Sequence, residues 1–277
     1  MSNFEIDSAD ILSEGFVRLY RQPTDRPFTP ENTLNIEADF TSLARLHAAV
    51  NTVFRQEAQL AAQSPFAWNP EFGYVTARPE FCGTGLEISA LLHLEAINLI
   101  GDLEPVLNAL AGLRMSAWGF CNDGLRNAAH LFRVTNLHHL GIDERDLASR
   151  VGRVFTDLIQ QETNARIRLV EELPRLFEDA IARALAVLRS CRLLSEWELL
   201  DIVSPLRLAA NLGFLDGLSR NEAKALMDKR LSLIPSTGST SYEEQQERDR
   251  QDAILADKVN KRFKGVRLNA FAKEWLT

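Results

Sequence analysis

One stretch, residues 72–94, most constrains what this chain can fold into. It begins with a short β-prone run and enters a loop that contains Pro79, Gly83 and Gly85. Glycine adopts backbone conformations that other residues avoid, and the amides of such a loop can close on a small anion. On spacing alone, an ordinary turn is the simpler interpretation. The apolar segment that leaves the loop, from Ser89 to about Leu113, has a mostly helical pattern.

The composition is that of an ordinary soluble globular protein, with 45% apolar and 25% charged residues among 277. The formal net charge of −7 argues against a general nucleic-acid surface. Three widely spaced cysteines form no Cys-x-x-Cys pair, so the sequence predicts neither a disulfide framework nor a zinc site. Because no stretch approaches about 18 apolar residues and no signal sequence is evident, we expect a cytoplasmic protein that does not bind membranes.

The rest of the chain predicts a mixture of strands and helices. Residues 11–21 are typical of an apolar strand, and residues 113–141 of a strand, a loop and a second strand. Residues 39–64 and 143–173 place apolar side chains at steps of three and four, and a further helix is predicted after Pro174. Periodicity alone therefore indicates an α+β chain whose second half is mainly helical.

Several motifs resemble the ATP:guanidino phosphotransferases, which include the arginine and creatine kinases and the bacterial protein-arginine kinases. The catalytic loop of that family has a Gly-Thr-Gly-Leu motif and a later Leu-His-Leu, as this chain has within residues 72–94. The resemblance implies a guanidino-kinase catalytic domain, a mainly antiparallel sheet flanked by helices, with a helical C-terminal part. Further similar segments are residues 115–141, 161–166 and 206–213.

Comparison with the pattern of this family divides the chain into four predicted segments. Residues 1–38 are a degenerate N-terminal strand and loop, because a family segment between residues 28 and 31 is missing from the sequence. Residues 39–234 are the guanidino-kinase-like domain, and residues 235–242 have the composition of a linker. Residues 243–277 form a charged helical tail, which we interpret as a solvated helix, with a partner-binding surface as the alternative.

The residues that carry the family's chemistry are substituted here. Phosphoryl transfer needs cations around the phosphates and carboxylates that orient the guanidinium. The family cysteine falls at Arg78, and two phosphate-binding arginines fall at Glu87 and Trp118. The substrate glutamate falls at Arg126. One charge reversal at about 4 Å changes an interaction by several kcal/mol, so we expect no catalytic residues.

Some positions that match the family remain as candidate nucleotide-binding remnants. Arg18 and Arg21 match two family arginines, while the first family arginine falls at Gly15 or Phe16. His93 matches the family histidine that could touch an adenine, but a core or surface histidine is the simpler interpretation. The complete set of predicted remnants is Arg18, Arg21, Gly83, Thr84, Gly85 and His93.

A second candidate site lies near the C-terminal part of the chain. Arg220, Asn221 and Lys224 resemble the Arg-Asp-x-x-Arg-Ala motif with which protein-arginine kinases bind phosphoarginine. An ordinary exposed helix is the alternative, because so short a motif arises easily by chance. No metal site is predicted, since His138 and His139 are adjacent and would point to opposite faces of a strand.

The resemblance with these substitutions predicts a pseudokinase that binds and regulates a protein instead of catalysing a reaction. The implied partners are an active arginine kinase, a phosphoarginine-bearing protein or a second copy of the chain, without nucleic acid. We expect no cofactor. The alternative is a divergent Mg-ATP-dependent guanidino or protein-arginine kinase rebuilt from Arg18, Arg21, Arg78 and Asp123. A purely structural assembly module is the third interpretation.

Overall fold

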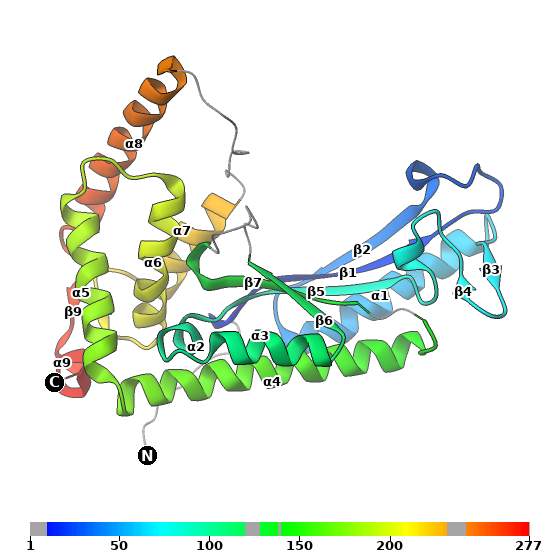
Figure 1. Ribbon diagram of the computed structural model, residues 1–277, viewed down its shortest axis with the longest axis horizontal. Coiled ribbons are helices and arrows are strands. Elements are labelled where there is room, and N and C mark those ends of the chain that lie inside the picture. The colour runs from blue at the N-terminus through cyan, green and yellow to red at the C-terminus, as the bar shows by residue number, and fades with distance from the viewer. Residues whose placement is uncertain (1–9, 120–127, 138–139, 232–241, 277) are drawn as a thin grey trace.

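The computed structural model describes residues 10–119, 128–137, 140–231 and 242–276. At its centre lies a five-stranded sheet in the order β2-β1-β5-β7-β6 (Figure 1). Every neighbouring pair in this sheet is antiparallel, which confirms the mainly antiparallel sheet expected from the resemblance. The strands are β1 (Leu12–Arg21), β2 (Leu34–Phe40), β5 (Leu86–His93), β6 (Met115–Gly119) and β7 (Leu131–Asn136).

The middle strand, β5, corrects one prediction from the sequence. The segment after Ser89 was expected to be helical, but it continues as a strand to His93, and helices begin only at Glu95. All residues of β5 except Glu87 are buried, those that point to the helices and those on the opposite side of the strand alike. A strand buried on both faces reads as a continuous apolar run, which periodicity cannot distinguish from a buried helix.

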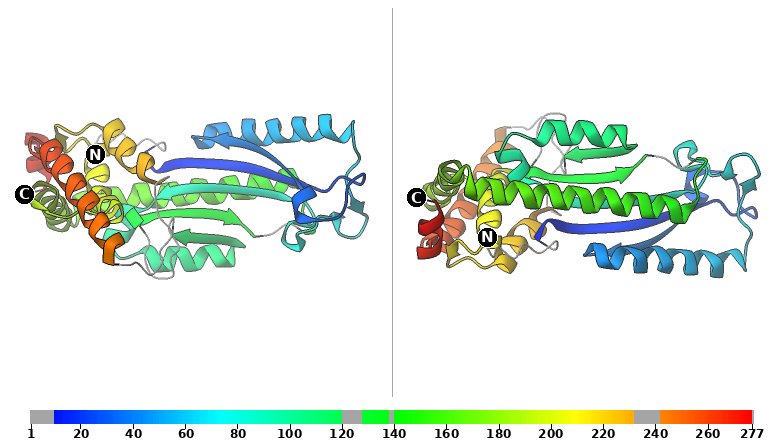
Figure 2. Two further views of the ribbon diagram at one scale, coloured as in Figure 1. Left: turned by 90° about the horizontal axis from the view of Figure 1, so that it is seen from above. Right: turned by 90° about the horizontal axis from the view of Figure 1, so that it is seen from below.

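Three long helices cover one face of the sheet, as Figure 2 shows from below. They are α1 (Leu43–Ala61), α3 (Leu103–Gly112) and α4 (Glu144–Glu171). The side chain of Asp143 caps α4 by accepting hydrogen bonds from the first amides of the helix. Residues at alternate positions of the strands, such as Val17 and Ile88, are fully buried against these helices. The opposite face carries no described helix over its strands, and we call it the open face (Figure 2).

The C-terminal helices stand together at one end of the sheet (Figure 1). They confirm the predicted helical C-terminal part and are α5 (Pro174–Ser190), α6 (Glu196–Asn211), α7 (Arg220–Leu231), α8 (Tyr242–Phe263) and α9 (Ala270–Leu276). The predicted charged tail begins with α8, which buries Val259 and Phe263 and packs on α5. Its exposed first half is highly charged, so only its second half contributes to the core.

The remaining elements of the described residues are short. They are β3 (Trp68–Asn69), β4 (Gly73–Tyr74), β8 (Leu215–Asp216), β9 (Arg267–Leu268), the helix α2 (Glu95–Leu99) and three 3-10 turns, η2 (Pro30–Asn32), η3 (Pro79–Phe81) and η4 (Ala128–His130). The predicted boundary after residue 38 falls inside β2, and most of the predicted linker 235–242 lies outside the described residues. Within the described ranges, no helix combines the length and the apolar character needed to cross a membrane.

Gly15 on β1 generates the first testable prediction, because a Cβ there would lie 2.2 Å from the ring of Phe40. We expect Gly15→Ala to lower the free energy of unfolding by about 1–3 kcal/mol through overpacking. The matched control is Gly112→Ala at the end of α3, where no atom lies within 4 Å and the change should be neutral or slightly stabilising. Urea unfolding measures both.

The Phe40→Leu background identifies the cause of the loss. If the ring is responsible, Gly15→Ala costs less in Phe40→Leu than in the natural chain, as a double-mutant cycle measures. An equal cost in both backgrounds would contradict the steric explanation.

Candidate functional site

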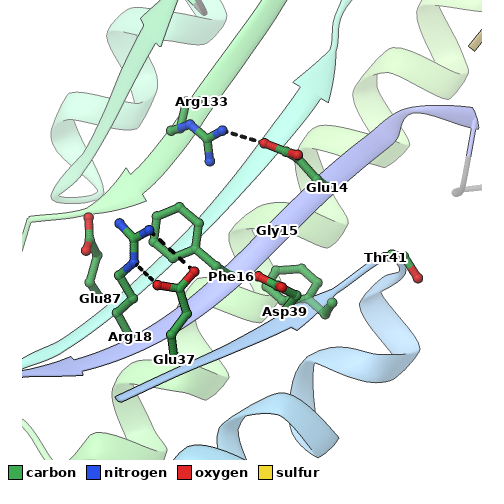
Figure 3. A pocket seen from close by; sticks show the side chains of 10 residues that line it. Glu14, Gly15, Phe16, Arg18, Glu37, Asp39, Thr41, Glu87 and Arg133 are labelled. Carbon is green, nitrogen blue, oxygen red and sulfur yellow. Dashed lines mark hydrogen bonds and ion pairs between the residues drawn. The ribbon is translucent and has the colours of Figure 1, made fainter. Parts of the chain in front are cut away.

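The open face holds a pocket of about 680 Å³ between β2, β1, β5 and β7 (Figure 3). Antiparallel register creates this site, because Arg18 pairs across the sheet with Glu37 on one side and Glu87 on the other. Side chains two residues apart on one strand share a face, so alternate residues of β1 line the pocket. The lining residues are Glu14, Gly15, Phe16, Arg18, Glu37, Asp39, Phe40, Thr41, Glu87 and Arg133.

The two guanidinium groups of the pocket are already paired within the chain. Arg18 donates to Glu37 at 2.6 Å, and Arg133 donates to Glu14 at 2.6 Å (Figure 3). Both groups also lie over the Phe16 ring, with their Cζ atoms 3.9 and 5.4 Å from its centroid. Four carboxylates against two guanidiniums give the lining a net charge of −2.

Glu87 is held in place by its neighbours on the open face. The hydroxyl of Tyr20 donates to the Glu87 carboxylate at 2.8 Å, and the Phe81 ring stacks on the Tyr20 ring with centroids 3.8 Å apart. Burial raises the pKa of Tyr20 to about 12, and the hydrogen bond to the Glu87 carboxylate acts in the same direction. A carboxylate is therefore fixed where the resemblance places a phosphate-binding arginine.

Both positions at which the first family arginine could fall, Gly15 and Phe16, line the pocket. The Phe16 ring lies beneath the Arg18 guanidinium, and Gly15 approaches the ring of Phe40. An irregularity between Leu12 and Glu14 shifts the register of β1 against β5. Neither Gly15 nor Phe16 supplies a cation to the pocket.

Arg21, a predicted nucleotide-binding remnant, is buried on the helix side of the sheet and does not line the pocket. Its guanidinium pairs with Glu57 at 2.5 Å, donates to the Thr84 carbonyl at 2.8 Å and lies 3.5 Å from the centroid of the Tyr74 ring. Glu144 lies 3.8 Å away. Arg21 thus joins β1 to the glycine loop, to β4 and to the helices α1 and α4.

The glycine loop itself, Gly83-Thr84-Gly85, is buried and bonded to its surroundings. The Gly83 amide donates to the Tyr74 carbonyl at 2.9 Å. Gly85 has φ of +57°, and a Cβ there would lie 2.5 Å from the Tyr20 carbonyl oxygen. These glycines are needed for close packing of the loop against β1, which is the simpler of the two predicted roles.

The positions of the family's reacting groups lie apart from the pocket or outside the described residues. Arg78 is exposed at the start of η3, and its amide donates to the Thr76 hydroxyl. Trp118 lies 56% exposed on the edge strand β6 and does not line the pocket. Arg126, Cys121, Asp123, His138 and His139 lie outside the described residues.

His93 is fully buried at the end of β5, with its Nε2 atom 2.8 Å from the Ser204 hydroxyl of α6. It is a core histidine here and does not line the pocket. Arg220, Asn221 and Lys224 form a separate group on α7, where Arg220 lies 3.6 Å from the Asp10 carboxylate.

Several pocket residues share the property that no sequence motif singles them out. Glu14, Glu37, Asp39 and Arg133 match no family motif, and they become neighbours only through pairing of four strands. The signal that could have found them is the alternation of charged and apolar residues along β1 and β2.

The lining does not fit a nucleoside triphosphate. Its net charge is −2, and Arg18 and Arg133 are held by Glu37 and Glu14, so a triphosphate would meet excess negative charge. Among the described residues, no group of three or more His, Cys, Asp or Glu side chains could hold a metal ion.

Comparison with protein families matches two successive parts of the chain. Residues 30–165 match the ATP:guanido phosphotransferase C-terminal catalytic domain, and residues 174–274 match the protein-arginine kinase McsB C-terminal domain. The second match reaches residue 274, so it includes most of the predicted charged tail, residues 243–277. The matches begin in η2 and end in α9, with residues 166–173 between them and β1 before them.

Curated relatives are named protein-arginine kinases. The protein of Moorella thermoacetica is 34% identical over 182 residues, which cover 66% of this chain and 52% of the relative. The protein of Clostridium novyi is 30% identical over 204 residues, which cover 73% of this chain and 58% of the relative. The chain thus spans little more than half the length of these relatives.

Comparison with solved structures finds two kinases at low similarity. Lombricine kinase has a TM-score of 0.40 and 14% identity, covering 59% of this chain and 69% of that one. The substrate-free duplicated taurocyamine kinase of Schistosoma mansoni has a TM-score of 0.37 and 19% identity, covering 46% of this chain and 16% of that one.

The two family-matching arginines of β1 generate a second prediction, because one is buried and the other lies at the surface. We expect Arg21→Met to lower the free energy of unfolding by about 3 kcal/mol, since it leaves the Glu57 carboxylate without its buried partner. Arg18→Met is the matched control on the same strand and should cost no more than about 1 kcal/mol, because its ion pair is partly exposed. Equal losses in urea unfolding would show that Arg21 is not a structural residue.

Proposed function

Because this chain belongs to the ATP:guanido phosphotransferase family, we propose that it is a pseudokinase that acts by binding a protein. The observation that carries the proposal is the pocket of the open face, whose charges are opposite to those a triphosphate needs. Glu87, and either Gly15 or Phe16, occupy positions where the resemblance expects arginines, and none of these side chains can bind phosphate oxygens.

The remaining cations of this region support the same proposal. Arg18 and Arg133 could turn to a ligand only by leaving Glu37 and Glu14, whose carboxylates would then face the phosphates. At about 4 Å and an effective dielectric of 20, each such contact costs about 4 kcal/mol. The alternative of a rebuilt kinase would need Arg21, which is occupied by Glu57 and the Thr84 carbonyl.

For the partner, we propose an active protein-arginine kinase or a protein that carries phosphoarginine, in the cytoplasm. The relatives named protein-arginine kinase motivate the first. Arg220, Asn221 and Lys224, which lie on α7 away from the pocket, are the proposed phosphoarginine contacts. A second copy of the chain stays a further proposal.

Thermal unfolding of the chain with Mg-ATP, and separately with phosphoarginine, tests the proposal. We expect no shift with Mg-ATP and no phosphorylation of arginine or of an arginine-rich protein. A ligand present at 100 times its Kd would stabilise the fold by about 2.7 kcal/mol, so a null result is informative. The Moorella thermoacetica protein-arginine kinase is the control for both assays. Mg-ATP binding together with arginine phosphorylation would falsify the pseudokinase.

Restoring the family charges provides a complementary prediction. Phe16→Arg with Glu87→Arg adds three positive charges and changes the pocket lining from −2 to +1. We expect this double variant to gain stabilisation by Mg-ATP that the natural chain lacks. The control is Phe16→Gln with Glu87→Gln, which alters the same positions without adding arginines. If Mg-ATP stabilised only the control variant, the charge of the pocket lining would not explain nucleotide binding.

A further inference from the structure

A buried polar cluster away from the pocket joins the sheet to the C-terminal helices. It contains Glu95 of α2, Ser204 of α6, His93 of β5 and His130 of η4, of which only His130 has notable exposure. The Glu95 carboxylate contacts the Ser204 hydroxyl, and it lies 2.6 Å from Nδ1 of His130. The Glu95 carboxylate therefore joins α2 directly to α6 and η4, and β5 is joined through the contact of His93 with Ser204.

The turn η4 is held in an unfavourable conformation. Ala129 and His130 have φ of 59° and 50°, a left-handed backbone that residues other than glycine rarely adopt. Such a backbone persists where its surroundings hold it. Here the Ala129 amide donates to Asp201 of α6 at 2.7 Å, and the Leu94 amide donates to the His130 carbonyl at 2.9 Å.

The number of protons in the cluster limits which of its hydrogen bonds can form at the same time. The Ser204 hydroxyl has one hydrogen but lies within hydrogen-bond distance of two acceptors, the Glu95 carboxylate and the Ala129 carbonyl. Burial lowers the pKa of His93 well below its ordinary value, and the positive charges of Arg207 and Arg166 act in the same direction. His93 is therefore neutral, which leaves His130 as the cation that faces Glu95.

The other charged groups around Glu95 and His130 have partners of their own. On α4, Glu162 accepts from the amides of Ala96 and Ile97 and pairs with Arg166. On α6, Asp201 accepts from the turn, and Arg207 donates to the Ser13 hydroxyl. Among the described residues of this cluster, His130 is thus the titratable group that both compensates Glu95 and reaches solvent.

We propose that η4 and α6 form a pH-sensitive switch, in which protonated His130 holds the strained turn closed and neutral His130 loosens it. The proposal rests on the fold and is independent of the proposed function. When His130 is neutral, Nδ1 can still donate a hydrogen bond, but the charge on the buried Glu95 carboxylate is no longer compensated. The turn then loses a contact that offsets its strained backbone.

The direction of the pH dependence follows from the surroundings of His130. Burial lowers the pKa of His130, but the hydrogen bond to Glu95 and the negative charges of Glu95, Asp201 and Glu162 raise it by more. The closed turn therefore binds a proton more tightly than the open one. Closure is complete below pH of about 6.5, the ordinary histidine pKa, and weakens as the pH rises through the raised pKa.

Two measurements on the whole chain test the switch. The first is an NMR titration of the histidine side chains, in which His130 should titrate above 6.5 in the natural chain and lower in Glu95→Gln. The second is amide hydrogen exchange, corrected for the intrinsic effect of pH. The opening constant of the Ala129 and Leu94 amides should rise about tenfold per pH unit between the two pKa values, as expected for one linked proton.

Matched variants separate the switch from general effects of pH. His130→Gln should remove the pH dependence of exchange in η4, whereas His47→Gln, the same change at an exposed position of α1, should leave it intact. A pKa of His130 at or below 6.5 in the natural chain would overturn the proposal, even if Glu95→Gln failed to fold. Unchanged pH dependence in His130→Gln would overturn it as well.

Discussion

The buried guanidinium of Arg21 is the interaction on which the arrangement of loop and sheet depends. It contacts the Thr84 carbonyl, the Glu57 carboxylate and the Tyr74 ring, so one charge fixes β1, the glycine loop, β4 and α1 together. A buried charge is tolerated only when such partners surround it. The loop that resembles a phosphate-binding element is therefore held by hydrogen bonds and packing within the chain.

The two faces of the sheet contribute differently to the stability of the fold. The helix face holds the apolar side chains whose burial stabilises the fold, as at Val17 and Ile88. The open face holds partly exposed ion pairs such as Arg18–Glu37, which contribute little to stability. Charges on the open face can consequently change without loss of the fold, and a family member can keep its architecture while its phosphate site is altered.

The cluster around Glu95 connects the sheet to the helical end of the molecule. Its polar contacts pass from β5 and η4 to α6, and the neighbouring pair Glu162–Arg166 anchors α2 on α4. Apolar packing between the same elements has no dependence on pH, whereas a carboxylate compensated by a histidine does. The proposed switch thus lies at the joint between the sheet and the C-terminal helices.

The sequence by itself determined the family, because its motifs are local in the chain. The antiparallel sheet with flanking helices and the substitutions at Arg78, Glu87 and Trp118 followed from the resemblance to that family, whereas periodicity predicted only an α+β chain. Only the tertiary structure decided that β5 is a strand, that Arg21 is buried and that Phe16 lines the pocket. Burial and strand register arise from contacts between residues distant in the chain, and a shift of one residue reverses the face of every side chain. Local sequence patterns specify neither burial nor strand register.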